Sequence, residues 1–234
     1  MFLARGEEWH ARITKRMTKE IERMNNNQVL LAGEIVSDFE YSHEVYGEAF
    51  YFMMFSVERI SGTVDCIPVM VSERLIDINS DLIGKHVCII GQYRSFNKHD
   101  GDKSRLELSV FAIELELLDE ENEVIIQSEN NKIFLDGYIC KAPAYRKSPL
   151  GREIADILVA VNRLYGKSDY IPCICWGRNA RFASGLEVGA RVQLYGRIQS
   201  RGYLKKLSET EAEQRVAYEV SASRIEVYEP EVES

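Results

Sequence analysis

The sequence lacks a long hydrophobic run and any recognisable export signal. None of its apolar runs approaches the roughly 18 residues that a membrane-spanning helix needs, and its first residues do not resemble a secretion signal. We therefore expect a soluble cytoplasmic protein, associated with the nucleoid if it binds DNA, with no membrane partner.

Cysteine and histidine are also sparse. The five cysteines among 234 residues form no CxxC pair, and the four histidines have no ligand spacing beside them. This usage predicts apolar thiols in a reducing compartment, with no metal site and no cofactor. The sequence contains no GxSxG motif and no P-loop, and its carboxylates form no recognisable acid/base pair. We predict no catalytic residues and no enzymatic activity.

Charge is distributed unevenly along the chain. The net charge of −8 divides into +2 for residues 1–27, −13 for 28–130, +6 for 131–228 and −3 for 229–234. A polyanion would be attracted to the second half and repelled by the first.

A repeat with an offset of 104 to 105 positions relates the two halves. It matches the glycines at 33 and 137, the arginines at 59 and 163, and the prolines at 68 and 172. Further along it matches Gly91 to Gly196 and Ser95 to Ser200, among others. The chain therefore contains a duplicated domain of about a hundred residues.

Each copy predicts five strands rich in β-branched and aromatic residues. In the second copy the segment 178–186 has helical composition and lies between the third and fourth strands. This order is that of an OB-fold, a five-stranded Greek-key barrel. The predicted fold is thus all-β, with two tandem OB-folds after an N-terminal helix. The predicted strands are 29–36, 48–57, 64–71, 85–94 and 105–117 in the first copy, and 132–140, 153–162, 170–176, 190–200 and 215–227 in the second.

The predicted domain boundaries follow from these patterns. Apolar residues at three- and four-residue steps predict a helical extension over 1–27. The first OB-fold, acidic and degenerate, covers 28–118, and a linker covers 119–130. The second OB-fold covers 131–228, and a short acidic tail covers 229–234.

Aromatic and basic residues share one side of two predicted strands. Tyr170 and Trp176 are separated by an even number of positions, so both point to one side of an extended strand. In 190–200 and its continuation, alternation leaves a polar, mostly basic row outside the barrel: Arg191, Gln193, Arg197, Gln199, Arg201 and Tyr203. Rings that stack on bases, beside cations that contact phosphates, are typical of single-strand binding. Rings buried in a β core are the alternative reading.

The second copy contains four motifs in a fixed order: the LxGxI opening at 135–139, the AVNR-Y segment, DYIPCICWG and GRIQSR-Y. Through these motifs it resembles the bacterial single-stranded DNA-binding proteins. The resemblance implies non-enzymatic binding of single-stranded DNA in replication, recombination or repair. It implicates Arg163, Tyr165, Tyr170, Trp176 and Tyr203. With the basic row and nearby cations, the predicted nucleic-acid-binding residues are Arg163, Tyr165, Tyr170, Trp176, Arg178, Arg197, Gln199, Arg201, Tyr203 and Lys205.

The first copy departs from this pattern. It has Ser61, Cys66 and Ser72 opposite Tyr165, Tyr170 and Trp176, so we expect it to contribute little to binding. The family usually works as four OB-folds, and two per chain imply a homodimer. The short end EPEVES lacks the family's apolar tip, so recruitment of replication or repair proteins by that route is not expected.

Two other readings stay open at this stage. The chain could be a protein-interaction or assembly factor, a primosomal-type accessory that uses the acidic first OB-fold. RNA binding is a variant, because stacking does not identify the sugar.

Overall fold

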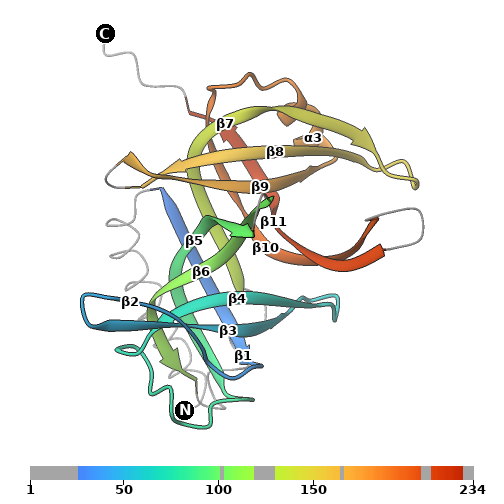
Figure 1. Cartoon of the computed structure of the whole chain (residues 1–234). Helices are drawn as coiled ribbons and strands as arrows, with labels where there is room; N and C mark the ends of the chain where they lie inside the picture. Colours follow the sequence, from blue (N-terminus) through green and yellow to red (C-terminus); the bar gives the residue numbers. More distant parts are fainter. Residues whose placement is uncertain (1–25, 101–102, 119–129, 164–165, 207–211, 229–234) are drawn as a thin grey trace, which may run out of the picture.

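Alternating buried and exposed residues build two closed β-barrels, one from each half of the chain (Figure 1). The computed structural model describes residues 26–100, 103–118, 130–163, 166–206 and 212–228. The strands of the first barrel are β1 (Asn27–Ile35), β2 (Glu40–Val45), β3 (Glu48–Glu58), β4 (Val64–Ser72), β5 (His86–Asp100) and β6 (Lys103–Leu117). The second half forms β7 (Asn131–Lys147), β8 (Glu153–Asn162), β9 (Ser168–Trp176), α3 (Arg178–Ser184), β10 (Arg191–Lys206) and β11 (Ala212–Val227).

Both barrels close in the same strand order. The first runs β1-β3-β4-β6-β5 and returns to β1, and the second runs β7-β8-β9-β11-β10 and returns to β7. The pairs β4–β6 and β9–β11 are parallel, while the other pairs are antiparallel. This is the strand order 1-2-3-5-4-1 of an OB-fold, so the predicted pair of tandem OB-folds is confirmed.

A glycine in the fourth strand lets each barrel bend. The pairing of β5 with β6 shifts register at Gly91, and that of β10 with β11 shifts at Gly196. A Cβ at either glycine would overlap a backbone carbonyl of the facing strand, that of Phe111 or Ser221. The repeat therefore retains glycine where the strand bulges and a second backbone comes close.

The two halves differ between their third and fourth strands. The predicted helix of the second half is observed as α3, which ends at Ser184 instead of residue 186. In the first half the corresponding residues form turns instead of a helix. There the Asp77 carboxylate accepts hydrogen bonds from the backbone N–H of Asn79 (3.1 Å) and the hydroxyl of Ser80 (2.8 Å). Such local bonds compete with helix formation.

The barrels join through β1 and β7, and the register reveals a pseudo-twofold axis. In this antiparallel pair Val29 faces Ile133, and these two residues are equivalent in the repeat. The axis therefore passes between them and exchanges the two barrels. Figure 1 shows β1 and β7 crossing the middle of the molecule, with one barrel on each side.

Contacts across this axis occur in reciprocal pairs. The side-chain amide of Asn26 donates to the Asn162 carbonyl, and that of Asn130 donates to the Glu58 carbonyl, both at 2.6 Å. Asn26 and Asn130 are equivalent in the repeat, as are Glu58 and Asn162, so each half satisfies a backbone carbonyl of the other. The duplicated barrels are held like the two subunits of a symmetric dimer.

Two parts of the prediction cannot be compared with the structure. The predicted N-terminal helix over 1–27 lies almost wholly outside the described residues, as does most of the 119–130 linker and the 229–234 tail. In the described part of the chain, no helix is long and apolar enough to span a membrane.

Candidate nucleic-acid interface

The outer face of β9 carries the two rings that the sequence pattern placed together. Ile171, Cys173 and Cys175 point into the core, so Tyr170 and Trp176 lie on the opposite face, 44% and 38% exposed. The indole Nε1–H of Trp176 donates to the Ser221 hydroxyl at 3.2 Å. This bond fixes one edge of the indole and leaves part of the ring open to a stacking partner.

A groove of about 740 Å³ runs beside Trp176 and is lined by four arginines. Arg152 follows the β7–β8 turn, and Arg197 and Arg201 belong to β10. The fourth, Arg59, comes from the β3–β4 turn of the first barrel. The groove therefore combines one partly exposed indole with positive charge from both halves of the chain.

Arg197 makes no ion pair with any of the described residues. Burial and the nearby charge of Arg59 both lower the pKa of its guanidinium. Removal from water and repulsion between like charges are unfavourable for an unpaired cation. A phosphate in the groove would reduce both effects, because its charge would lie between two arginines.

Three other predicted residues lie in or beside this groove. Gln199 forms part of its lining but is only 6% exposed, and its amide donates to the Glu219 carboxylate at 2.8 Å. Arg201 is exposed and lies 3.4 Å from the same carboxylate. Tyr203, 37% exposed, lies further along β10. Gln199 thus has its side-chain amide committed within the protein, while Arg201 and Tyr203 stay accessible.

Arg163 occupies a different environment from the one expected of a phosphate contact. It forms a two-bond pair with the carboxylate of Asp169, which is 1% exposed, and donates to the Ser95 carbonyl at 2.9 Å. Asp169 also accepts from the Ser95 backbone N–H at 2.5 Å. The Arg163 guanidinium therefore links the second barrel to β5 of the first.

The pseudo-twofold axis relates this Arg–Asp pair to an equivalent pair in the first barrel. Arg59 donates twice to Asp65, both at 2.6 Å, and Asp65 accepts from the Ser200 backbone N–H at 2.7 Å. Arg59, Asp65 and Ser200 are the repeat equivalents of Arg163, Asp169 and Ser95. We call these two sets the inter-barrel clamps.

The remaining predicted residues lie outside the groove. Arg178 is exposed at the first position of α3, and Lys205 is exposed near the end of β10. Tyr165 lies outside the described residues. Among the described residues, no group of three His, Cys, Asp or Glu side chains could hold a metal ion.

Two groove residues were missed by sequence reasoning, Arg59 and Arg152. The repeat matched Arg59 to Arg163 and so gave a signal for Arg59. That signal was discounted because the first half is acidic and lacks the rings of the second. Arg152 lies between the β7–β8 turn and β8, where the sequence shows only a cation among ordinary surface residues.

Comparisons with known proteins agree with this geometry. Residues 130–228 match the model of the single-strand binding protein family. The chain is 33% identical over 108 residues to single-stranded DNA-binding protein A of Bacillus subtilis, and 30% identical over 107 residues to single-stranded DNA-binding protein 2 of Listeria innocua. Each match covers 43% of this chain, and 60% and 65% of the respective relatives. The chain thus spans less than two thirds of the length of these relatives.

A solved structure resembles both barrels together. The single-stranded DNA-binding protein from Thermus aquaticus superposes with a TM-score of 0.66 at 21% identity, covering 87% of this chain and 93% of that one. At this identity the likeness establishes the fold of the whole tandem arrangement. The family match and the curated relatives agree that residues 130–228 are similar to the single-strand binding protein family.

Proposed function

We propose that this chain binds single-stranded DNA without catalysing a reaction and takes part in replication, recombination or repair in the cytoplasm. The observation that carries the proposal is the groove beside Trp176, where Arg197 forms no ion pair with a described residue and Arg59 and Arg201 lie nearby. In a bound single strand, a base can stack on the indole while the neighbouring phosphates contact these arginines. The names of the relatives from Bacillus and Listeria support the same ligand.

Tryptophan fluorescence tests this proposal directly, because the chain has only two tryptophans and the other is Trp9. Titration with oligo(dT) should quench the fluorescence, and a Trp176→Phe variant should lose most of that quenching. Affinity should fall as salt is raised, since each neutralised phosphate releases counterions. If no quenching occurs and an independent assay detects no binding, the proposal is wrong. The alternative, a protein-interaction or assembly factor, would then be favoured.

Arg197→Ala should lower the slope of log affinity against log salt by about 1, the loss of one phosphate contact. The matched control is Arg74→Ala. Arg74 is exposed, pairs with Glu48 at 3.2 Å and does not line the groove. An equal change of slope in both variants would indicate a loss of general positive charge instead of a contact at Arg197. Competition between oligo(dT) and oligo(rU) would establish which sugar is preferred.

We further propose that two chains associate into a homodimer with four OB-folds. The outer face of the second barrel carries a patch of partly exposed rings. Phe134 and Tyr195 lie 4.9 Å apart, and Tyr228 stacks under Arg191. Such a patch suits a self-complementary interface. Light scattering should give twice the chain mass of 26.9 kDa, and Tyr195→Arg should shift the mass toward one chain. A monomeric mass for the parent protein would contradict the dimer.

A further inference from the structure

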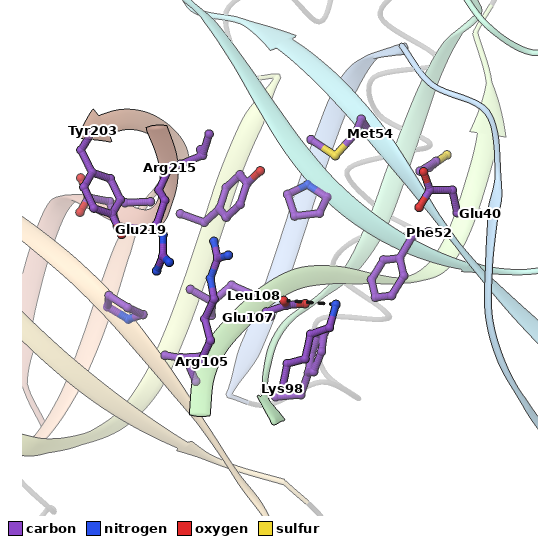
Figure 2. Close-up of a pocket in the computed structure, with 18 of the residues that line it drawn as sticks. Glu40, Phe52, Met54, Lys98, Arg105, Glu107, Leu108, Tyr203, Arg215 and Glu219 are labelled. Atoms are coloured by element: carbon purple, nitrogen blue, oxygen red, sulfur yellow. Dashed lines mark ion pairs between the residues drawn. The ribbon is translucent and has the colours of Figure 1, made fainter. Parts of the chain in front are cut away.

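A second cavity, of about 620 Å³, lies between the barrels, and both halves of the chain form its walls (Figure 2). From the first barrel come Phe52, Phe96 and Arg105, on β3, β5 and β6. From the second come Pro172, Tyr203 and Arg215, on β9, β10 and β11. In Figure 2 Tyr203 and Arg215 enter from the β10–β11 hairpin on one side, opposite Phe52, with Arg105 between them.

The cavity offers accessible aromatic faces. The rings of Phe52 and Phe96 lie nearly parallel, with centroids 6.3 Å apart and planes inclined by 29°. Phe96 is 38% exposed and Tyr203, from the other barrel, 37% exposed. Partly exposed rings that line a cavity present flat faces on which a nucleobase can stack, and stacking tolerates any base.

The cavity also contains a guanidinium without an ion-pair partner among the described residues, that of Arg105. Of the carboxylates near it, Glu213 pairs with Arg215 at 2.6 Å, Glu107 lies 3.8 Å from Lys98, and Glu219 accepts the Gln199 amide. Glu40 also lines the cavity, on the side of Phe52 and away from Arg105 (Figure 2). A guanidinium without an acidic partner, close to exposed rings, matches the two parts of a nucleotide, its phosphate and its base.

The cavity lies next to the groove beside Trp176 along β10. On the outer face of β9, Pro172 lies between Trp176 and Tyr170, which are about 20 Å apart at the rise of a β-strand. On β10, Gly202 lines the groove and the next residue, Tyr203, lines the cavity. A strand that follows β9 from Trp176 toward Tyr170 therefore passes the cavity.

We propose that this inter-barrel cavity is a second nucleotide-binding subsite for the same single strand, with a base stacked on Phe96 and a phosphate at Arg105. The inference rests on the proposed single-strand binding and adds the first barrel to it. Comparison of the two repeats did not predict that the first barrel binds a nucleotide. The rings of the first half lie opposite Asp156 and Arg201, and not opposite the family's ring positions.

The test compares oligo(dT) of increasing length, from about 4 to about 16 nucleotides, the range of site sizes of an OB-fold. Each oligonucleotide is titrated into the parent protein and into Phe96→Leu, with Trp176 fluorescence and the anisotropy of a 5′ label as readouts. The shortest oligonucleotide that quenches Trp176 should bind both proteins equally. Longer ones should bind Phe96→Leu about 10-fold more weakly than the parent, a loss within the range of one stacked base.

Phe50→Leu is the matched control. Phe50 lies on the same strand as Phe52 but contacts Phe111 and does not line the cavity. Its removal should leave the length dependence unchanged. A second measurement needs no variant: photocrosslinking of the parent protein to oligonucleotides that carry 5-iododeoxyuridine at successive positions. We expect adducts on the peptides that contain Phe96 or Tyr203.

The outcomes separate this inference from the proposed function. Trp176 quenching with the same length dependence in both proteins, and no adduct at the cavity, would refute the second subsite and leave the groove intact. Absence of quenching in the parent at every length would refute the proposed function and the subsite together. A length-dependent loss in Phe96→Leu, with adducts at the cavity, supports both.

Discussion

Breaking an inter-barrel clamp should destabilise the protein far more than breaking a surface ion pair of the same type. Asp169 is 1% exposed and accepts hydrogen bonds from Arg163 and from the Ser95 backbone. Removing one partner of a buried pair costs about 3 to 5 kcal/mol. Asp169→Asn keeps the shape and one acceptor oxygen, so we expect a loss near the lower end, about 3 kcal/mol. The matched surface pair is Asp156 with Arg146, whose side chains are 43% and 49% exposed. There Asp156→Asn should cost less than about 1 kcal/mol.

Urea unfolding followed by circular dichroism measures both losses. For a slope of about 3 kcal/mol per molar urea, Asp169→Asn should lower the unfolding midpoint by about 1 M and Asp156→Asn by less than about 0.3 M. The slopes must stay equal for the midpoints to report stability. If Asp169→Asn shifted the midpoint no more than Asp156→Asn, the clamp would not hold the barrels together.

Three further predictions concern close packing and burial in the two barrels. Gly196→Ala should lower the free energy of unfolding by about 3 kcal/mol, because its Cβ would overlap a carbonyl of β11, whereas Gly202→Ala should leave it unchanged. An equal effect of the two in urea would contradict the close approach. Tyr93→Phe should preserve or raise stability, since the buried hydroxyl has no hydrogen-bond partner in the described structure, and a loss above about 1 kcal/mol would disprove this. Burial raises the pKa of Cys88 to about 12, so at pH 8 about one thiolate in ten thousand is present. Mass spectrometry after iodoacetamide treatment at pH 8 should find Cys66, which is exposed, modified well before Cys88, and equal rates would contradict the burial.

The strands could be predicted from the sequence because buried and exposed residues alternate along most of them. The predicted bounds of β8 agree with the observed Glu153–Asn162. The sequence placed the end of β10 near residue 200, but the strand continues to Lys206. Beyond residue 200 the strand is sustained by its pairing with β11, from Arg201↔Ala217 to Lys206↔Ala212. Hydrogen bonds between backbones do not require apolar residues, so the sequence of this extension shows no hydrophobic pattern from which the strand could be predicted.

The candidate site could be predicted only in part, since a sequence shows the type of a residue but not its partner. Parity placed Tyr170 and Trp176 on one face of β9, because alternation along a strand is a local property. Arg163 could not be recognised as a clamp residue, since its contact with Ser95 depends on how the two barrels meet. The repeat did point to Arg59, but the acidity and the missing rings of the first half argued against a binding role there.

The pseudo-twofold axis explains how the first half could become acidic while its basic residues stayed at the junction of the barrels. Reciprocal contacts such as Asn26 with Asn162, and Asn130 with Glu58, need equivalent residues in both halves. Surfaces away from the axis carry no such requirement and can change in charge and in ring content. Of the seven Lys and Arg residues in 28–130, three line the two cavities between the barrels: Arg59, Lys98 and Arg105. The net charge of −13 over that segment therefore does not describe the part of the first barrel that faces the second. Under the proposed function a strand along β9 would meet cations from both halves, and the two barrels would act as one binding unit.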